Sequence, residues 1–164
     1  MKQPIAYDDA VDLLDADHKA VKKMFIDYGA LCEDGAPNEQ KQELAQRICQ
    51  SLADHAQLEE EVFYPAVSKA IEDGALITNA LDEHAMAKKT IARIEGMKAT
   101  HAAYDVTVKE LGKLIDQHVL EEREQIFLKA RLAPLDLRSL TLPMLKRQQQ
   151  LKKKSAAAPA KEAA

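Results

Sequence analysis

Four histidines lie one apiece on four successive helix-like segments of the chain, at His18, His55, His84 and His118. Two of them are followed four residues later by a glutamate, in the pairs His55 with Glu59 and His118 with Glu122. Residues four apart on a helix share one face, with Cβ atoms about 5–6 Å apart, so each pair can offer an imidazole and a carboxylate to one centre. These ligands suit Fe, Mn, Zn or Cu. The pattern therefore predicts a metal site inside a helical bundle.

Four amphipathic helices are expected to position these side chains. Apolar residues recur at alternating spacings of three and four over about residues 7–33, 38–73, 76–99 and 104–132, and the histidines and both glutamates occupy positions in that apolar pattern. His18 and His55 lie at similar distances from the turn signal at Gly35, and His84 and His118 at similar distances from the turn near His101. Antiparallel neighbours joined by short turns would bring each pair to the same height.

Pro65 is expected to interrupt the second helix. If that helix ran straight to Gly74, Glu59 and His84 would lie at different distances from the turn and could not meet. A proline inside a helix removes one hydrogen bond and clashes with a carbonyl of the preceding turn. We therefore predict a break near Pro65, with Ala66–Asp73 as a short separate helix that folds across the end of the bundle.

Length and composition indicate one all-α domain. The chain has 164 residues, of which 46% are apolar and only 4% aromatic, and helix-forming residues dominate. We expect a helical domain over residues 1–133, a C-terminal extension over 134–150 and a disordered Lys/Ala/Pro tail over 151–164. Pro134 and Pro143 argue against a continuous helix in the extension.

The charge distribution and hydropathy restrict the partners. Residues 146–164 hold six basic residues and one acidic residue, so residues 1–145 carry a net charge of −9. An acidic body of this kind is not typical of a nucleic-acid-binding protein. No apolar stretch approaches the roughly 18 residues of a membrane span, and no leader-like segment precedes Val11. We expect a cytoplasmic protein without a nucleic-acid or membrane partner.

Taken alone, each of these residues could have a structural role and bind no metal. A single histidine among apolar residues is more often a core residue than a metal ligand. Four histidines and two glutamates together would be costly to bury without a cation. The joint pattern therefore favours a metal, and a metal-free helical interaction module stays as the alternative. Nearby acidic residues are expected in solvent, although Glu121 could contact a ligand and Asp82 or Glu83 could orient an imidazole.

The order of these residues resembles the hemerythrin-like HHE cation-binding domain. The likeness covers about residues 8–132 and is carried by Asp17-His18, the stretch from His55 to Pro65, Glu83-His84, and His118 with Glu122. It implies an up-down-up-down antiparallel four-helix bundle that holds two irons in a non-haem, oxo-bridged centre, with manganese or zinc as alternatives. The implied metal ligands are His18, His55, Glu59, His84, His118 and Glu122.

Two departures from oxygen-carrying hemerythrins bear on function. Those proteins have a fifth histidine on the third helix, where Ala80 and Lys88 flank His84 here, and they place the last carboxylate where this chain has Arg123. A smaller histidine set leaves positions for water or an oxidant. We expect a protein that binds or reacts with O2, peroxide or NO in sensing, scavenging or iron handling. An enzyme that breaks down peroxide or donates iron for iron–sulfur repair is the alternative.

Overall fold

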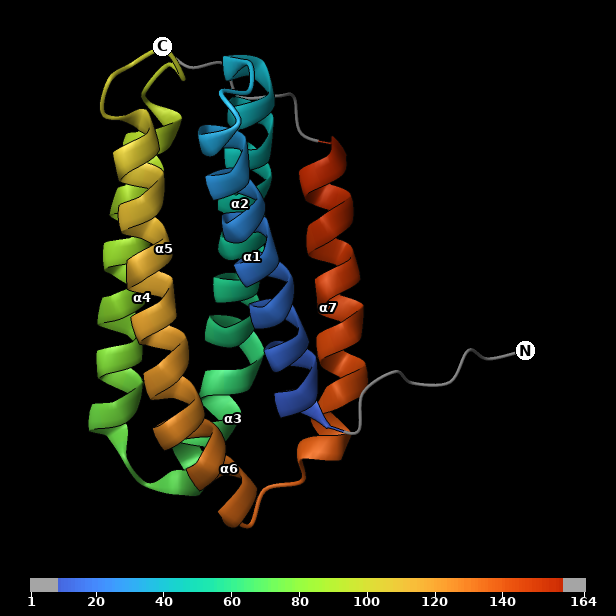
Figure 1. The fold of residues 1–164 in the computed structure, drawn as a ribbon. Helices are drawn as coiled ribbons and strands as arrows, with labels where there is room; N and C mark the ends of the chain where they lie inside the picture. The colour runs from blue at the N-terminus through green and yellow to red at the C-terminus, as the bar shows by residue number, and fades with distance from the viewer. Residues whose placement is uncertain (1–8, 158–164) are drawn as a thin grey trace.

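The computed structural model describes residues 9–157, and all regular secondary structure within that range is helical. This confirms the all-α class. The long helices are α1 (Ala10–Glu33), α2 (Asn38–Leu58), α4 (Gly74–Glu95), α5 (Tyr104–Glu121) and α7 (Leu137–Ala157). In Figure 1 the chain runs upward in α1, downward in α2, upward in α4 and downward in α5, with these four helices beside one another.

Polar caps and left-handed turn residues set several helix ends. The Asp9 carboxylate accepts the backbone N–H of Asp12 at the start of α1, and Asp73 accepts the N–H of Leu76 at the start of α4. Gly35 adopts a φ of +63° directly after α1, a conformation that costs glycine least. The first turn therefore lies where the sequence predicted it.

The core consists of two apolar clusters with the histidines between them. On α1, His18 lies between Leu14 of one cluster and Val21 of the other. The other three histidines occupy the same boundary on their own helices: His55 lies between Leu52 and Leu58, His84 between Ala80 and Ala87, and His118 between Leu111 and Ile126. All four histidines therefore lie in one layer across the molecule. The height comparison predicted this level for each of the two pairs, but its expectation that an unbroken second helix would keep Glu59 away from His84 was wrong, because the two side chains lie 3.3 Å apart.

Pro65 does not break the helix, so that prediction was wrong. The chain passes from α2 through a π-helical turn, η1 (Glu59–Phe63), directly into α3 (Tyr64–Ile71), which continues downward from α2 in Figure 1. The N–H of Tyr64 donates to the carbonyl of Glu59, five residues back. This wider turn keeps the backbone helical on both sides of Pro65. Residues 66–73 therefore do not form a separate helix across the end of the bundle.

A second π-helical turn, η2 (Glu122–Phe127), follows α5 and leads into α6 (Leu128–Leu132). This segment contains no proline. The feature that η1 and η2 share is that each begins at the glutamate of a His-x-x-x-Glu pair. π-helical turns inside α-helices are frequent at functional sites.

The C-terminal extension forms a continuous helix, which corrects the expectation drawn from Pro143. Helix α7 runs through Pro143, which is exposed, while Leu137, Met144 and Leu151 are buried in the cluster that also holds the start of α1. Burial of this apolar stripe, with a spacing of seven residues, outweighs the local cost of a proline. Residues 151–157 of the expected disordered tail are helical, and residues 158–164 lie outside the described range.

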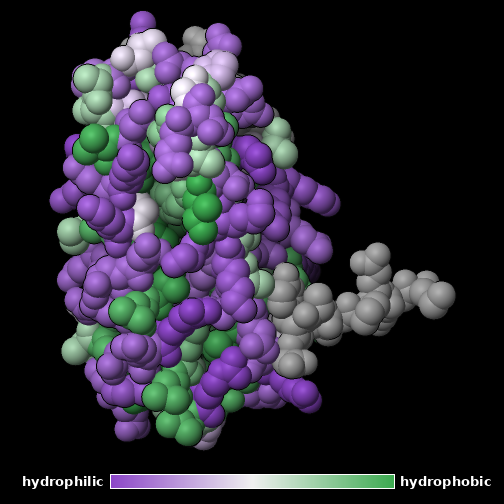
Figure 2. All heavy atoms as spheres, in the orientation of Figure 1, coloured by the Kyte–Doolittle hydropathy of each residue, from purple (hydrophilic) through white to green (hydrophobic). Residues whose placement is uncertain are grey.

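Hydrophilic residues cover most of the face shown in Figure 2, with hydrophobic residues scattered among them. Among residues 9–157, no helix is long and apolar enough to cross a membrane.

Candidate metal centre

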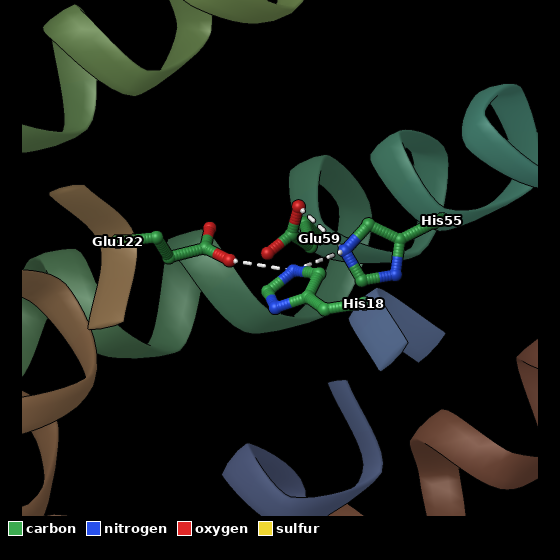
Figure 3. A group of neighbouring side chains, drawn as sticks. All are labelled: His18, His55, Glu59 and Glu122. Carbon is green, nitrogen blue, oxygen red and sulfur yellow. Dashed lines mark hydrogen bonds and ion pairs between the residues drawn. The ribbon is translucent and has the colours of Figure 1, made fainter. Parts of the chain in front are cut away.

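The structure brings all six predicted ligand residues together. The two glutamates are the most buried of them, with 0% of Glu59 and 1% of Glu122 exposed. They begin the π-helical turns η1 and η2, while the histidines come from the middle of α1 and α4 and the last turns of α2 and α5. Figure 3 shows His18, His55, Glu59 and Glu122 pointing toward one another from their helices.

The histidines form two pairs. Nε2 of His18 lies 3.1 Å from Nε2 of His55, and Nε2 of His84 lies 3.2 Å from Nε2 of His118. In each pair the two rings meet edge to face, with centroids 4.8 Å apart. Each pair therefore directs two ring nitrogens to one point.

Each glutamate joins one histidine of the first pair to one of the second. Oε1 of Glu59 lies 3.2 Å from Nε2 of His55 and 3.3 Å from Nε2 of His84. Glu122 does the same from the other side, with Oε1 at 3.1 Å from Nε2 of His18 and Oε2 at 3.5 Å from Nε2 of His118. Both carboxylates therefore lie between the two histidine pairs.

The donor atoms form two groups within the described residues that could each hold a cation. One group contains His18, His55, Glu59 and Glu122, and the other contains Glu59, His84 and His118, with all donor atoms of a group within 4.8 Å of one another. Glu59 belongs to both groups. The arrangement fits two neighbouring metal ions that share a carboxylate.

The carboxylate oxygens at the centre lack the hydrogen bonds that burial normally demands. Both oxygens of Glu59 and Oε1 of Glu122 are buried without a hydrogen-bond partner of acceptable geometry, and so is Nδ1 of His18. Burial of an ionised carboxylate costs several kcal/mol unless it is paired. A divalent cation supplies the missing partner, so these residues fit a metal site.

Protons partly replace a cation in the metal-free centre. Burial lowers the pKa of His55, but the Glu59 and Asp17 carboxylates together outweigh burial and raise that pKa well above its ordinary value. Burial also lowers the pKa of His118, but the contacts with Glu122 and Glu59 outweigh burial and raise that pKa to about 9. Burial raises the pKa of Glu122, yet its contacts with His118 and His18 hold that pKa well below the ordinary range. The shifted pKa values therefore favour a negative Glu122 carboxylate and protonated His55 and His118 in the metal-free centre.

A second carboxylate faces the outer nitrogen of each histidine. On three of them Nδ1 lies 3.1 Å from a carboxylate oxygen, in the pairs His55 with Asp17, His84 with Glu60, and His118 with Glu83. The fourth contact is longer, 3.6 Å from Nδ1 of His18 to Asp15. A carboxylate on Nδ1 fixes the ring and leaves the Nε2 lone pair for a metal.

Three of these outer carboxylates are held by a donor of their own. Arg123 binds Asp15 through two nitrogens, at 2.6 and 2.7 Å, and holds the pKa of Asp15 below its ordinary value. Lys88 binds Glu60 at 2.8 and 3.0 Å. Gln148 of α7 donates to Asp17 at 3.1 and 3.0 Å.

Glu83 differs from the other outer carboxylates. Burial raises its pKa, and Glu121 rather than a cation lies beside it. Glu121 itself accepts hydrogen bonds from Gln117 and Asn79. Glu121 therefore lies beside Glu83 and not against one of the six central residues, so the expectation that it could contact a ligand is not met.

Sequence reasoning missed several of these outer residues. It placed Glu60 in solvent, whereas the structure turns Glu60 toward His84 on the neighbouring helix α4. Asp15 was not singled out, although it lies one helical turn before His18, which is the only signal the sequence carried. Gln148 gave no signal, because its contact depends on a helix that the prolines concealed.

A small cavity lies on the side of the histidine layer away from the glutamates. It measures about 40 Å³ and is bounded by the four histidines and by apolar side chains that include Val21, Leu52, Ile91 and Ile115. A cavity of that size has room for at least one water-sized molecule. On the glutamate side, the Tyr64 hydroxyl donates to Glu122, and the Phe127 ring stacks on His18 with centroids 5.8 Å apart.

The solved structure of a hemerythrin HHE cation-binding domain-containing protein from Mycobacterium kansasii has the same fold. It superposes with a TM-score of 0.73 at 19% sequence identity and covers 90% of both chains. A DNA nickase of Nostoc sp. (strain PCC 7120) is 27% identical over 116 residues, which are 71% of this chain and 32% of that protein. The chain thus spans about a third of the length of that relative.

The family model of the hemerythrin HHE cation-binding domain matches residues 9–130, a range that contains all six central residues and both π-helical turns. This match agrees with the two His/Glu groups found in the structure. The chain belongs to the hemerythrin HHE cation-binding domain family.

Proposed function

We propose that this chain is a cytoplasmic non-haem di-iron protein that binds or reacts with O2, peroxide or NO, in sensing, scavenging or iron handling. Manganese and zinc are the alternative metals. The observation that carries the proposal is the pair of buried glutamates, each without full hydrogen bonding and each lying between one histidine of one pair and one of the other.

The six central residues are the proposed ligands. His18 and His55 would hold one iron, His84 and His118 the other, and both irons would share Glu59 and Glu122. Family membership supports a cation at this place, and the donor set supports a transition metal, since imidazole and carboxylate without thiolate suit iron, manganese and zinc. The carboxylates on Nδ1 of the histidines support the same assignment, because such contacts orient metal-binding imidazoles.

The cavity above the histidines supports a small ligand. Its volume of about 40 Å³ suits a diatomic molecule or a peroxide, and apolar side chains form much of its wall. Bound iron would supply the electrons for reduction of an oxidant. The protein would exclude bulk water through Leu52 and Ile91 and hold a proton on Tyr64, whose hydroxyl donates to Glu122.

The six proposed ligands also define which part of the chain forms the proposed metal-binding domain. We assign the metal site to a domain over residues 1–133 in which α1, α2, α4 and α5 form an up-down-up-down bundle. No nucleic-acid or membrane partner belongs to this proposal. DNA nicking is no part of this proposal, because the chain spans only 32% of the Nostoc relative.

Anaerobic loading with Fe(II) tests the proposal. The wild-type protein should retain about two irons per chain after desalting, and air should produce near-UV charge-transfer bands. A matched variant with both His55→Leu and Glu59→Leu should retain less iron and lack those bands. Wild-type protein that retains no iron, zinc or manganese would contradict the proposal and leave the metal-free interaction module.

The same samples separate a binding protein from an enzyme. Peroxide consumed in many equivalents per iron indicates catalytic breakdown, whereas consumption that stops after the irons are oxidised indicates a sensor or scavenger. Transfer of iron to an apo acceptor, measured by metal analysis after separation, would indicate iron donation.

A further inference from the structure

We infer that Gln148 of α7 is a positioning residue of the metal centre, which acts on His55 through Asp17. This inference rests on the proposed function, because it assigns Gln148 a part in metal retention. Helix α7 begins at Leu137, beyond the residues that the family model matches. The link therefore adds a contribution from outside the family domain.

A continuous series of contacts joins α7 to the centre. The Gln148 side-chain amide donates to both oxygens of Asp17, at 3.1 and 3.0 Å. Asp17 Oδ2 lies 3.1 Å from Nδ1 of His55, whose Nε2 lies 3.1 Å from Nε2 of His18 and 3.2 Å from Glu59. One amide is thus two contacts away from a proposed metal-binding nitrogen.

The chemistry of the imidazole explains why this contact matters. When Asp17 accepts the proton on Nδ1, the ring presents the Nε2 lone pair to the metal, and its rotation is restricted. Asp17 can do this only while its own carboxylate is held in place. Gln148 holds both of its oxygens, as Arg123 does for Asp15 and Lys88 does for Glu60.

Asp17 has space to turn away if the amide is removed. A cavity of about 180 Å³ lies between α1, α2 and α7, and its lining includes Asp17, His55, Gln148, Asp54 and Lys152. The carboxylate could rotate into this space and exchange its contact with His55 for water or for Lys152. Gln148 therefore restricts a motion that the surrounding volume permits.

Helix α7 is held in place by contacts that do not involve Gln148. Arg147 binds Glu61 at 2.7 and 3.2 Å, and Ser155 donates to Asp54 at 3.1 Å. Met144 and Leu151 are 0% and 2% exposed against the core. Removal of the Gln148 amide should consequently leave α7 seated, which allows a positioning role to be separated from a role in folding.

The test compares Gln148→Leu with Gln149→Leu, its exposed neighbour on the same helix. Each protein is loaded with Fe(II) anaerobically, and with Zn(II) as a redox-silent probe, and release of each metal to a chelator is followed. We expect one of the two metal ions to leave Gln148→Leu on the order of tenfold faster than wild type, the lower end of the usual cost of losing an outer-sphere partner. Gln149→Leu should release both ions at the wild-type rate.

A double-mutant cycle with Asp17→Ala distinguishes positioning from a structural role. If Gln148 acts through Asp17, the double variant should release metal no faster than Asp17→Ala alone. Thermal unfolding of the metal-free proteins should differ little between Gln148→Leu and Gln149→Leu. The inference would be overturned if the two substitutions accelerated metal release independently, so that the double variant released metal faster than Asp17→Ala. It would also be overturned if Gln148→Leu accelerated release of both ions equally and greatly destabilised the metal-free protein.

Failure of this inference differs from failure of the proposed function. Wild-type protein that retains no metal removes both. Wild-type protein that retains two metal ions, together with Gln148→Leu that releases them at the wild-type rate, leaves the proposed function intact and removes only the role of Gln148.

Discussion

The Tyr64 hydroxyl donates a hydrogen bond to the buried carboxylate of Glu122, and its oxygen also lies 3.4 Å from Nε2 of His84. Tyr64 is 2% exposed and is the first residue after the π-helical turn that begins at Glu59. One side chain of α3 therefore contacts a proposed ligand from η2 and another from α4. Burial raises the pKa of Tyr64, so the phenol keeps its proton for this contact.

Tyr64→Phe should destabilise the metal-free protein more than the metal-loaded protein. Without the hydroxyl, a buried oxygen of Glu122 loses its donor, at a cost of about 1–3 kcal/mol. A bound cation compensates for that loss, so metal should raise the midpoint of thermal unfolding more in Tyr64→Phe than in wild type. Urea and thermal unfolding with and without Zn(II) measure both quantities.

Tyr28→Phe is the matched control for that experiment. Tyr28 is also a buried tyrosine that donates to a carboxylate, that of Asp105, but it lies in the apolar cluster on the other side of the histidine layer. Its loss should destabilise the metal-free and loaded proteins equally. An equal effect of metal on both variants would contradict a special role for Tyr64.

Replacing His55 and Glu59 together by leucine should lower metal retention without unfolding the chain. Exchange of buried charged groups for apolar ones of similar volume is often neutral or stabilising by about 1–4 kcal/mol. We expect the metal-free double variant to match or exceed wild-type stability in urea, while Zn(II) stabilises it less than it stabilises the wild type. His101→Leu alters an exposed histidine and should keep the wild-type response to metal. A double variant that still binds two metal ions would show that the ligands lie elsewhere.

Metal binding should strengthen, and the metal-free protein should weaken, as pH rises from 6.5 to about 9. In the metal-free centre, burial lowers the pKa of His118, but the contacts with Glu122 outweigh burial. The pKa of His118 therefore rises from 6.5 to about 9. Stability from a raised pKa is fully present below the unfolded value and is lost as pH passes the folded value. Metal must displace that proton, so its affinity increases over the same range.

Thermal unfolding across this pH range, with and without Zn(II), checks both signs. The midpoint of the metal-free protein should fall toward pH 9, and the increase caused by Zn(II) should grow. A metal-induced shift that shrinks with rising pH would be inconsistent with imidazole ligands.

Pro65→Ala should leave metal stoichiometry unchanged. The turn η2 forms without a proline, so proline is not what produces a π-helical turn at these glutamates. We expect Pro65→Ala to retain about two metal ions per chain and to show unaltered helix content by circular dichroism. Loss of one metal ion would indicate that Pro65 itself holds Glu59 in register.

The all-α class, the four helices and the six residues that meet at the centre could be predicted from the amino-acid sequence alone. Periodicity of apolar residues is a local property, and the histidines and glutamates occupied positions within it. Because short turns make neighbouring helices antiparallel, distances along the chain were enough to predict that His18 would meet His55 and that His84 would meet His118.

The contacts of the outer carboxylates could not be predicted from the sequence, because they depend on how the helices pack. Asp17 precedes His18 in the chain but faces His55, and Glu83 precedes His84 but faces His118. A residue next to a histidine on a helix points about 100° away from it, so its partner belongs to an adjacent helix, and helix periodicity does not identify that partner.

The path of the backbone around the centre was also decided at the tertiary level. Local rules for proline predicted a break at Pro65 and no helix through Pro143, yet both segments are helical. Burial of the apolar side chains of α7 outweighs the lost hydrogen bond at Pro143, and a π-helical turn accommodates the path at Pro65. Gln148 reaches Asp17 only because that helix forms, since residues 131 apart in the chain meet through packing of α7 on α1 and α2.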